Sequence, residues 1–119
     1  MFEQTYSFGF EAAHELSQNV DAGHDYAHVH GHSFEATVTL RGAPGSEGWL
    51  QDFAEVRAAC EGVRDRLDHR FLNRIDGLER PTLERLAVWI FDALRPALPL
   101  LSEVAVARPS LKERVAYRP

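Results

Sequence analysis

Histidines are concentrated in one short segment of the sequence. His28, His30 and His32 account for three of the chain's six histidines, and His32 leads directly into alternating apolar and polar residues. In an extended strand, residues two apart project to the same side and lie roughly 6.5–7 Å apart. His30 and His32 can therefore turn toward one ion, and His14 joins them if the strand that ends near it pairs antiparallel with theirs.

Three imidazoles without a thiolate form a ligand set that suits zinc. Three protein ligands leave one coordination position free, which is typical of catalytic rather than structural zinc sites. The alternative is a hydrated polar turn, with His14 as an ordinary residue at a strand end. We favour the metal site because His14, His30 and His32 share one parity along their strands. His24 and His28 are expected to be loop residues, with His28 the better placed to support a ligand.

Other residues that could take part in catalysis or binding give weaker signals. Asp68 and His69 are adjacent, and two interpretations stand equally: an imidazole whose charge suits a helix C-terminus, or a proton-transfer histidine oriented by a carboxylate. Thr82 and Glu84 are expected to cap a helix. Cys60 falls within an apolar stripe and is expected to be a core residue rather than a nucleophile.

Two segments have the period-2 alternation of half-buried strands. In residues 5–16 the shared side carries Tyr6, Phe8, Phe10, Ala12, His14 and Leu16; in residues 30–41 the apolar side carries Phe34, Ala36, Val38 and Leu40. Polar residues 17–29 predict a loop between these strands. Residues 41–48, rich in Gly and Pro, predict a turn after the second strand.

Two helices and two closing strands are predicted in the second half of the chain. Asp52 is a candidate N-cap with Glu55 as its capping-box partner, and the stripe that follows consists of Phe53, Val56, Cys60, Val63 and Leu67. Pro81 is expected in the first turn of the next helix, whose inner face carries Leu83, Ala87, Ile90 and Leu94. The closing strands are expected at Val104 and Val106 and at Val115 and Tyr117.

The order of these elements, ββααββ, defines the expected fold. It predicts one α+β domain over residues 1–119, with a four-stranded antiparallel sheet and two helices packed on one of its faces.

Composition restricts the class of protein. The net charge is −5, from 13 Lys and Arg against 18 Asp and Glu, which argues against a nucleic-acid-binding surface. No apolar run approaches the length of a membrane span, and the N-terminal residues lack the basic and apolar regions of a signal peptide. A single cysteine excludes an internal disulfide. These features predict a soluble cytoplasmic domain.

Six segments carry a resemblance that extends along nearly the whole chain. They are "FGFEAAHEL" (8–16), "HGHSFEATVTL" (30–40), "GWLQDFAEVRAA" (48–59), "LDHRFLN" (67–73), "LERPTLERLAVWIF" (78–91) and "VAYR" (115–118). In order and spacing they resemble the 6-pyruvoyl-tetrahydropterin synthase and 6-carboxy-tetrahydropterin synthase family. The resemblance is strongest to the bacterial 6-carboxy-tetrahydropterin synthases of queuosine biosynthesis.

The resemblance implies a T-fold (tunnelling-fold) subunit that forms barrels, usually a homohexamer of two stacked trimers with active sites between subunits. It implies zinc held by His14, His30 and His32. The implied substrate is 7,8-dihydroneopterin triphosphate, which the bacterial enzymes convert to 6-carboxy-5,6,7,8-tetrahydropterin with release of acetaldehyde and triphosphate. Zinc would act as a Lewis acid on side-chain oxygens of the substrate. His69, oriented by Asp68, would transfer a proton.

Two positions depart from the family pattern. Tyr26 lies four residues before His30, where the family has its catalytic cysteine, so Tyr26 is the expected acid or base there. Arg108 lies where the family anchors the pterin ring with a glutamate. A guanidinium offers donors only and prefers a carboxylate or phosphate. Glu113, in the following turn, is a candidate replacement for the missing carboxylate, and Thr82 and Glu84 complete the candidate substrate-binding residues.

The sequence leaves three functions open. The first is a zinc-dependent lyase with the bacterial family activity, and the second is a divergent enzyme that uses Tyr26 and His69 on another pterin-like or phosphorylated substrate. The third is a non-catalytic module that binds zinc and a ligand. A cupin site is a further reading of His28, His30 and Glu35, but two amphipathic helices do not suit a jelly roll.

Overall fold

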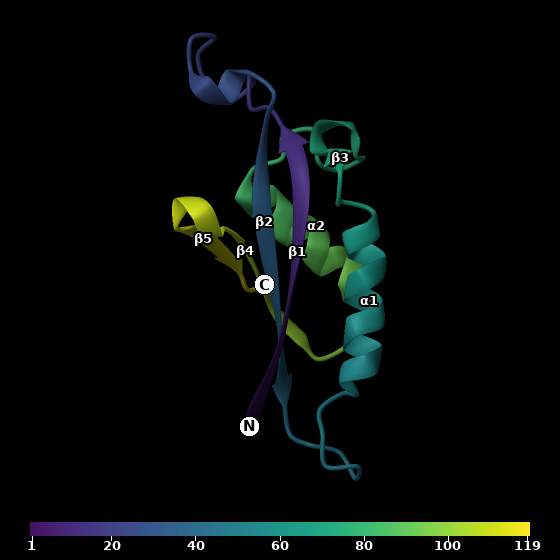
Figure 1. The fold of residues 1–119 in the computed structure, drawn as a ribbon. Coiled ribbons are helices and arrows are strands. Elements are labelled where there is room, and N and C mark those ends of the chain that lie inside the picture. The colour runs from purple at the N-terminus through teal and green to yellow at the C-terminus, as the bar shows by residue number, and fades with distance from the viewer.

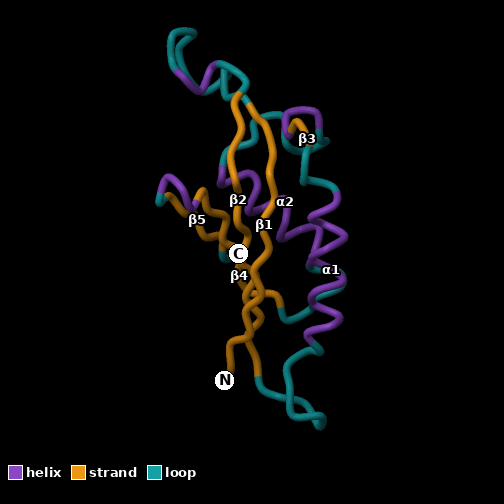
Figure 2. The backbone as a smooth tube through the Cα atoms, in the orientation of Figure 1, coloured by secondary structure: helices purple, strands orange, loops and turns teal.

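The structure, a computed structural model, describes residues 1–119 and is elongated, with extents of 57 × 23 × 23 Å. Figures 1 and 2 show a long two-stranded ribbon with the other elements packed beside it. The strands are β1 (Phe2–His14), β2 (His30–Gly42), β3 (Arg70–Phe71), β4 (Leu101–Arg108) and β5 (Glu113–Tyr117). The helices are α1 (Phe53–Asp65) and α2 (Leu83–Leu94), with short 3-10 turns η1 (Asp25–Ala27), η2 (Leu72–Arg74) and η3 (Pro109–Leu111).

The predicted hairpin is confirmed, although its first strand begins three residues before, and ends two residues before, the predicted range 5–16. β1 and β2 pair antiparallel from Phe2 opposite Gly42 to His14 opposite His30. Even-numbered residues of both strands enter the core, because side chains alternate across a strand; the buried ones are Phe8, Phe10, Ala12, His14, Phe34, Ala36, Val38 and Leu40. The hairpin therefore brings the predicted metal ligands to one end of the core face.

The prediction of a four-stranded, purely antiparallel sheet is wrong. The sheet has five strands in the order β3-β1-β2-β4-β5. β3 pairs parallel with β1, placing Ala12 opposite Arg70 and Ala13 opposite Phe71, so the sheet is mixed. β4 pairs antiparallel with both β2 and β5, as predicted. A two-residue strand is too short to produce an alternating pattern, which explains why β3 was missed.

Helix α1 begins as predicted, with one difference in its cap. Asp52 Oδ1 accepts a hydrogen bond from Ala54 N at 2.8 Å. The reciprocal half of the capping box is absent, because the Glu55 carboxylate instead accepts from Gln51 Nε2 at 3.2 Å. Cys60 is fully buried, and burial raises the pKa of its thiol to about 12, as suits a core residue. Phe53, predicted in the buried stripe, occupies the first helical position and is 49% exposed.

Helix α2 lies on the same side of the sheet as α1 (Figure 1). Its predicted inner face is confirmed, since Leu83, Ala87, Ile90 and Leu94 are all buried. Thr82 is the N-cap, and its Oγ1 accepts from Arg85 N at 3.2 Å. Pro81 therefore precedes the cap and is not in the first turn as predicted; its fixed φ sets the approach to the cap instead.

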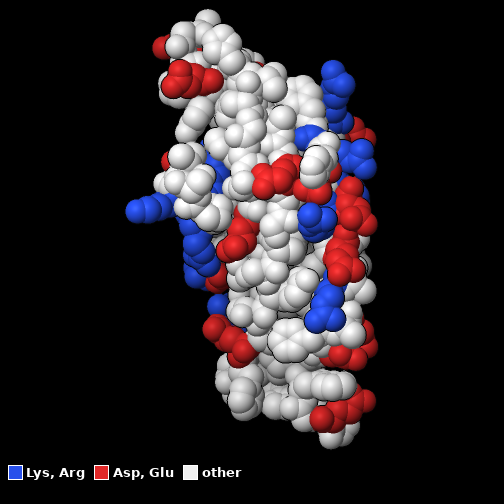
Figure 3. All heavy atoms as spheres, in the orientation of Figure 1, with Lys and Arg blue, Asp and Glu red and all other residues white.

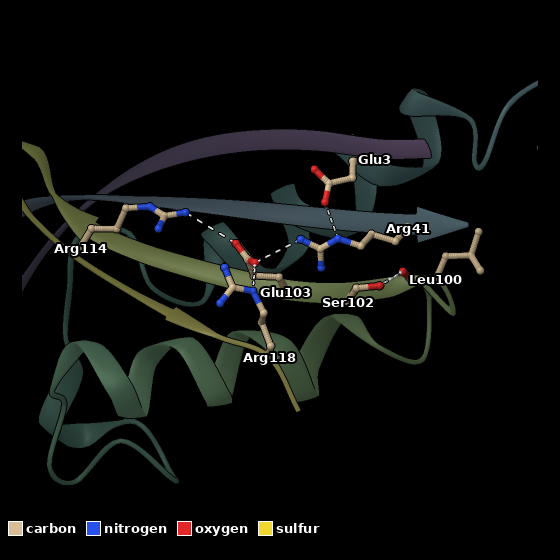
Figure 4. A network of polar contacts seen from close by, with 7 residues as sticks. All are labelled: Glu3, Arg41, Leu100, Ser102, Glu103, Arg114 and Arg118. Carbon is tan, nitrogen blue, oxygen red and sulfur yellow. Dashed lines mark hydrogen bonds and ion pairs between the residues drawn. The ribbon is translucent and has the colours of Figure 1, made fainter. Parts of the chain in front are cut away.

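The outer face of the sheet, away from the helices, carries a cluster of charged side chains (Figure 4). The Glu103 carboxylate, 6% exposed, pairs with Arg118 at 2.5 Å, Arg41 at 3.3 Å and Arg114 at 3.6 Å, and Arg41 also pairs with Glu3. Burial favours the protonated acid, but hydrogen bonds from Arg118 and Arg41 outweigh it. The pKa of Glu103 therefore lies below its ordinary value of 4.5.

We expect Glu103→Gln to lower the free energy of unfolding by about 1–3 kcal/mol, because three guanidinium groups lose their shared buried carboxylate. Denaturant unfolding at neutral pH measures this loss. Glu35→Gln is the matched control, since Glu35 is exposed and forms no ion pair. Equal losses in the two variants would contradict a stabilising role for the cluster.

The effect of Glu103→Gln should shrink in acid. The folded-state pKa of Glu103 is depressed, so its stabilising contribution is complete above the ordinary value of 4.5 and is lost as the pH falls through the folded-state value. The unfolding free energies of the wild-type and Gln proteins should therefore converge as the pH falls below 4.5 and through the lower folded-state pKa.

Neither helix in the structure is long and apolar enough to span a bilayer. On the face drawn in Figure 3, acidic and basic side chains are interspersed over the sheet and helices.

Candidate metal centre and its two cavities

The three predicted metal ligands meet at the end of the hairpin. One ring nitrogen from each of His14, His30 and His32 lies within 4.8 Å of the other two. The Nε2 atoms of all three imidazoles are buried and have no hydrogen-bond partner. Buried polar atoms are normally paired, so three unpaired nitrogens that converge on one point fit a bound cation. We call these residues the histidine triad.

Backbone carbonyls set the orientation of two imidazoles in the histidine triad. His14 Nδ1 lies 2.9 Å from the carbonyl oxygen of Pro81, and His30 Nδ1 lies 2.8 Å from that of His28. A carbonyl only accepts hydrogen bonds, so each Nδ1 carries the proton and each Nε2 presents a lone pair. This is the tautomer that a metal-binding histidine needs.

The surroundings of the histidine triad also favour neutral imidazoles. Burial, with smaller contributions from the charges of His30, His32 and Arg108, lowers the pKa of His14 from 6.5 to about 4, against the hydrogen bond to Pro81. The pKa of His32 is lowered first by burial and then by Arg108. Neutral imidazoles bind metal without first losing a proton.

Tyr26 lies against the histidine triad, as its position before the His-Gly-His motif predicted. Its ring stacks on that of His30, with centroids 5.1 Å apart and planes inclined by 21°. The loop is fixed there because Leu16 N donates to the Tyr26 carbonyl at 2.7 Å. His24 and His28 are exposed loop residues, as predicted; His24 Nδ1 accepts from Tyr26 N at 3.0 Å.

Asp68 and His69 form the carboxylate–imidazole pair that was one of two readings of the sequence. Helix α1 has already ended at Asp65, and His69 Nδ1 lies 2.9 Å from Asp68 Oδ2. A hydrogen bond from Glu11 N, followed by the one from His69, keeps the pKa of Asp68 below its ordinary value of 3.8. The imidazole is 80% exposed, so its Nε2 edge faces outward for contact with a ligand.

Two cavities are lined by residues of the histidine triad. The larger, about 560 Å³, is lined by His32 together with His69 and residues of β1 and β3. The smaller, about 260 Å³, is lined by His14 together with Thr82, Glu84, Arg108 and Glu113. The structure thus gathers Thr82, Glu84 and Arg108, which were predicted to bind substrate, in one cavity with Glu113 and His14, while His69 borders the other cavity.

A family model described as 6-pyruvoyl tetrahydropterin synthase matches residues 3–119. This chain belongs to the 6-pyruvoyl tetrahydropterin synthase family. Its backbone superposes on the 6-pyruvoyl tetrahydropterin synthase of Caenorhabditis elegans with a TM-score of 0.87 at 24% identity, covering 99% of this chain and 95% of that one. The T-fold that the resemblance implied is thereby confirmed as the overall fold of this family member.

Two curated relatives of this synthase-family protein differ in their reactions. It is 40% identical over 106 residues to a 6-carboxy-5,6,7,8-tetrahydropterin synthase of Synechocystis sp., covering 83% of this chain and 80% of that one. It is 34% identical over 108 residues to a dihydroneopterin monophosphate aldolase of Pyrococcus furiosus, covering 91% and 86%. Membership of the family therefore leaves open which bonds of the substrate are cleaved.

Parts of the site in this synthase-family protein had no signal in the sequence. The carbonyls of Pro81 and His28 orient the triad, but backbone atoms leave no residue-type signature. His28 was expected to support a ligand with its side chain and does so with its carbonyl. The ion pair of Arg108 with Glu113, at 2.5 Å, was also unpredicted. The only sequence feature that relates Arg108 to Glu113 is their separation by five residues across the η3 turn.

Proposed function

We propose that this protein is a zinc-dependent lyase that acts on the side chain of 7,8-dihydroneopterin triphosphate or a related pterin and forms 6-carboxy-5,6,7,8-tetrahydropterin. Two observations carry the proposal: one ring nitrogen from each of the three imidazoles lies within 4.8 Å of the other two, and all three Nε2 atoms are buried without a hydrogen-bond partner. Membership of the family and the relative named for this reaction support it.

His14, His30 and His32 would hold the zinc, since their lone pairs already face one another. Bound zinc supplies a Lewis acid that polarises oxygens of the substrate side chain. His69 would accept or donate a proton at Nε2, because its Nδ1 is bonded to Asp68, which also stabilises the protonated ring. Thr82 and Glu84 would bind the pterin from the rim of the smaller cavity.

A second candidate is aldol cleavage of a dihydroneopterin phosphate. Two observations favour it: the relative named as a monophosphate aldolase, and Tyr26 at the position where the family has cysteine. The phenol of Tyr26 carries an O–H group, which can donate a proton to the departing fragment of the substrate. This candidate keeps the same zinc ligands and the same His69.

The free edges of the sheet support assembly into a homo-oligomer. β3 covers β1 only at Ala12 and Ala13, so the backbone of β1 from Phe2 to about Ser7 has no partner strand on that side. β5 is the other edge. Unpaired edges favour pairing with another chain, and pairing β5 of one copy with β1 of the next closes a ring. We propose the hexamer of two trimers and a cytoplasmic location on the family resemblance.

Product analysis separates the candidate functions. Zinc-loaded protein is incubated with 7,8-dihydroneopterin triphosphate and, separately, with the monophosphate, and the products are identified by mass spectrometry. The proposal predicts 6-carboxytetrahydropterin and acetaldehyde from the triphosphate. A 6-hydroxymethyl pterin and a phosphorylated two-carbon aldehyde would identify the aldolase instead. Pterin binding without turnover of either substrate would contradict both and indicate a binding module.

A further inference from the structure

Arg108 has an environment that its ion pair alone does not explain. It ends β4 and is 9% exposed, although it carries a full positive charge. Its guanidinium has one hydrogen-bond partner, Glu113 Oε2, and its Nε is buried without a partner. A buried charged group with unpaired donors costs free energy. Such a cost is usually retained where the group serves a ligand.

The guanidinium of Arg108 lies close to the histidine triad. Its Cζ is 5.6 Å from the centre of the Tyr26 ring, and that ring stacks on His30. Arg108 also lines the smaller cavity together with His14. A ligand in this cavity can therefore contact both the buried cation of Arg108 and His14 of the triad.

The charged side chains that line the smaller cavity differ in their exposure to solvent. Four charged residues line it: Glu84, Arg108, Glu113 and Arg114. Of these only Arg108 is buried. The side chain of Glu113 is 43% exposed, so its carboxylate can turn into water at little cost, whereas the side chain of Arg108 is only 11% exposed. Arg114 pairs with Glu103 on the outer face of the sheet.

We propose that Arg108 binds an anionic oxygen group of the ligand, a phosphate or a carboxylate, and that Glu113 is the counter-ion displaced when this group binds. A planar guanidinium matches both anions through paired N–H donors. It has no acceptor for the N–H edge of a pterin ring. The inference rests on the proposed function, and it names the charged part of the substrate that this cavity selects.

Anion binding tests the inference without any turnover. Calorimetric titration of the purified zinc-loaded protein with inorganic phosphate, and separately with acetate, compares wild type with Arg108→Gln and Glu113→Gln. We expect Arg108→Gln to weaken binding of at least one of these anions by about tenfold or more. Glu113→Gln should tighten it about fivefold, since the internal competitor is gone. The anion that depends on Arg108 identifies the class of ligand group.

Controls make the result specific to the cavity. Arg114→Gln removes another arginine from the rim and should change the affinity by less than about twofold. Circular dichroism and zinc content should be unchanged in every variant. Affinity that is indifferent to Arg108→Gln, or weaker in Glu113→Gln, would overturn the inference. So would loss of 7,8-dihydroneopterin binding in Glu113→Gln alone, because Glu113 would then bind the ring. Product formation is measured separately, so failure here leaves the proposed function intact.

Discussion

His14→Ala protein is expected to lose its zinc, from about one ion per chain to about 0.1 or less. His14 is the most buried member of the triad, at 1% exposed, and alanine leaves two imidazoles, one fewer than a stable site requires. Turnover should fall by at least about 10³-fold when the zinc is lost. Elemental analysis of the purified protein by mass spectrometry, together with a turnover assay, measures both effects.

His28→Ala is the matched control for this experiment. It also removes an imidazole from the same segment, but the part of His28 that contacts the triad is its carbonyl, which alanine keeps. Zinc content and activity should therefore stay close to those of wild type. Full zinc occupancy in His14→Ala, or its loss in His28→Ala alone, would show that the ion binds elsewhere on the loop.

His69→Ala is expected to reduce turnover by about 10²–10⁴-fold while zinc content stays unchanged. The imidazole is not a member of the triad, although it lines the larger cavity together with His32, so its removal should affect proton transfer and not metal binding. Asp68→Asn should reduce turnover less, by about tenfold. His69 loses its carboxylate partner, but the amide oxygen at position 68 can still accept the hydrogen bond from Glu11 N. Steady-state kinetics on zinc-loaded variants measures these differences.

The kinetic constants of the variants at His69 and Asp68 distinguish proton transfer from substrate binding. A proton-transfer role predicts a lower kcat with a small change in KM, and partial rescue of His69→Ala by added imidazole. A change confined to KM would show that His69 only binds the substrate. Loss of zinc in His69→Ala would contradict the separation of this residue from the metal ligands.

Residue parity is the reason that the cluster of candidate metal ligands could be predicted from the sequence. A strand fixes which side chains share a face, so the common parity of His14, His30 and His32 survives any error in strand ends. The structure confirms that these residues meet. The Asp68–His69 pair was less certain in the sequence, because its geometry depends on where α1 ends and on a left-handed backbone at His69, with φ of 59°.

Elements with weak or no periodicity account for the errors in the predicted fold. β3 has only two residues, so it leaves no alternating pattern in the sequence. The turn after α1 brings it beside β1. Thr82 caps α2 and Pro81 lies outside the helix, because the threonine hydroxyl accepts a backbone hydrogen bond and proline only restricts φ. The long hairpin and the inner face of α2 were predictable, since each rests on many residues with one period.

X-ray diffraction at the zinc absorption edge tests the central claim most directly. Crystals of the zinc-loaded protein should show one anomalous peak bonded to Nε2 of His14, His30 and His32, at about 2.0–2.1 Å from each. An empty position between these three nitrogens with zinc in excess, or a peak held instead by His24 or His28, would contradict the account.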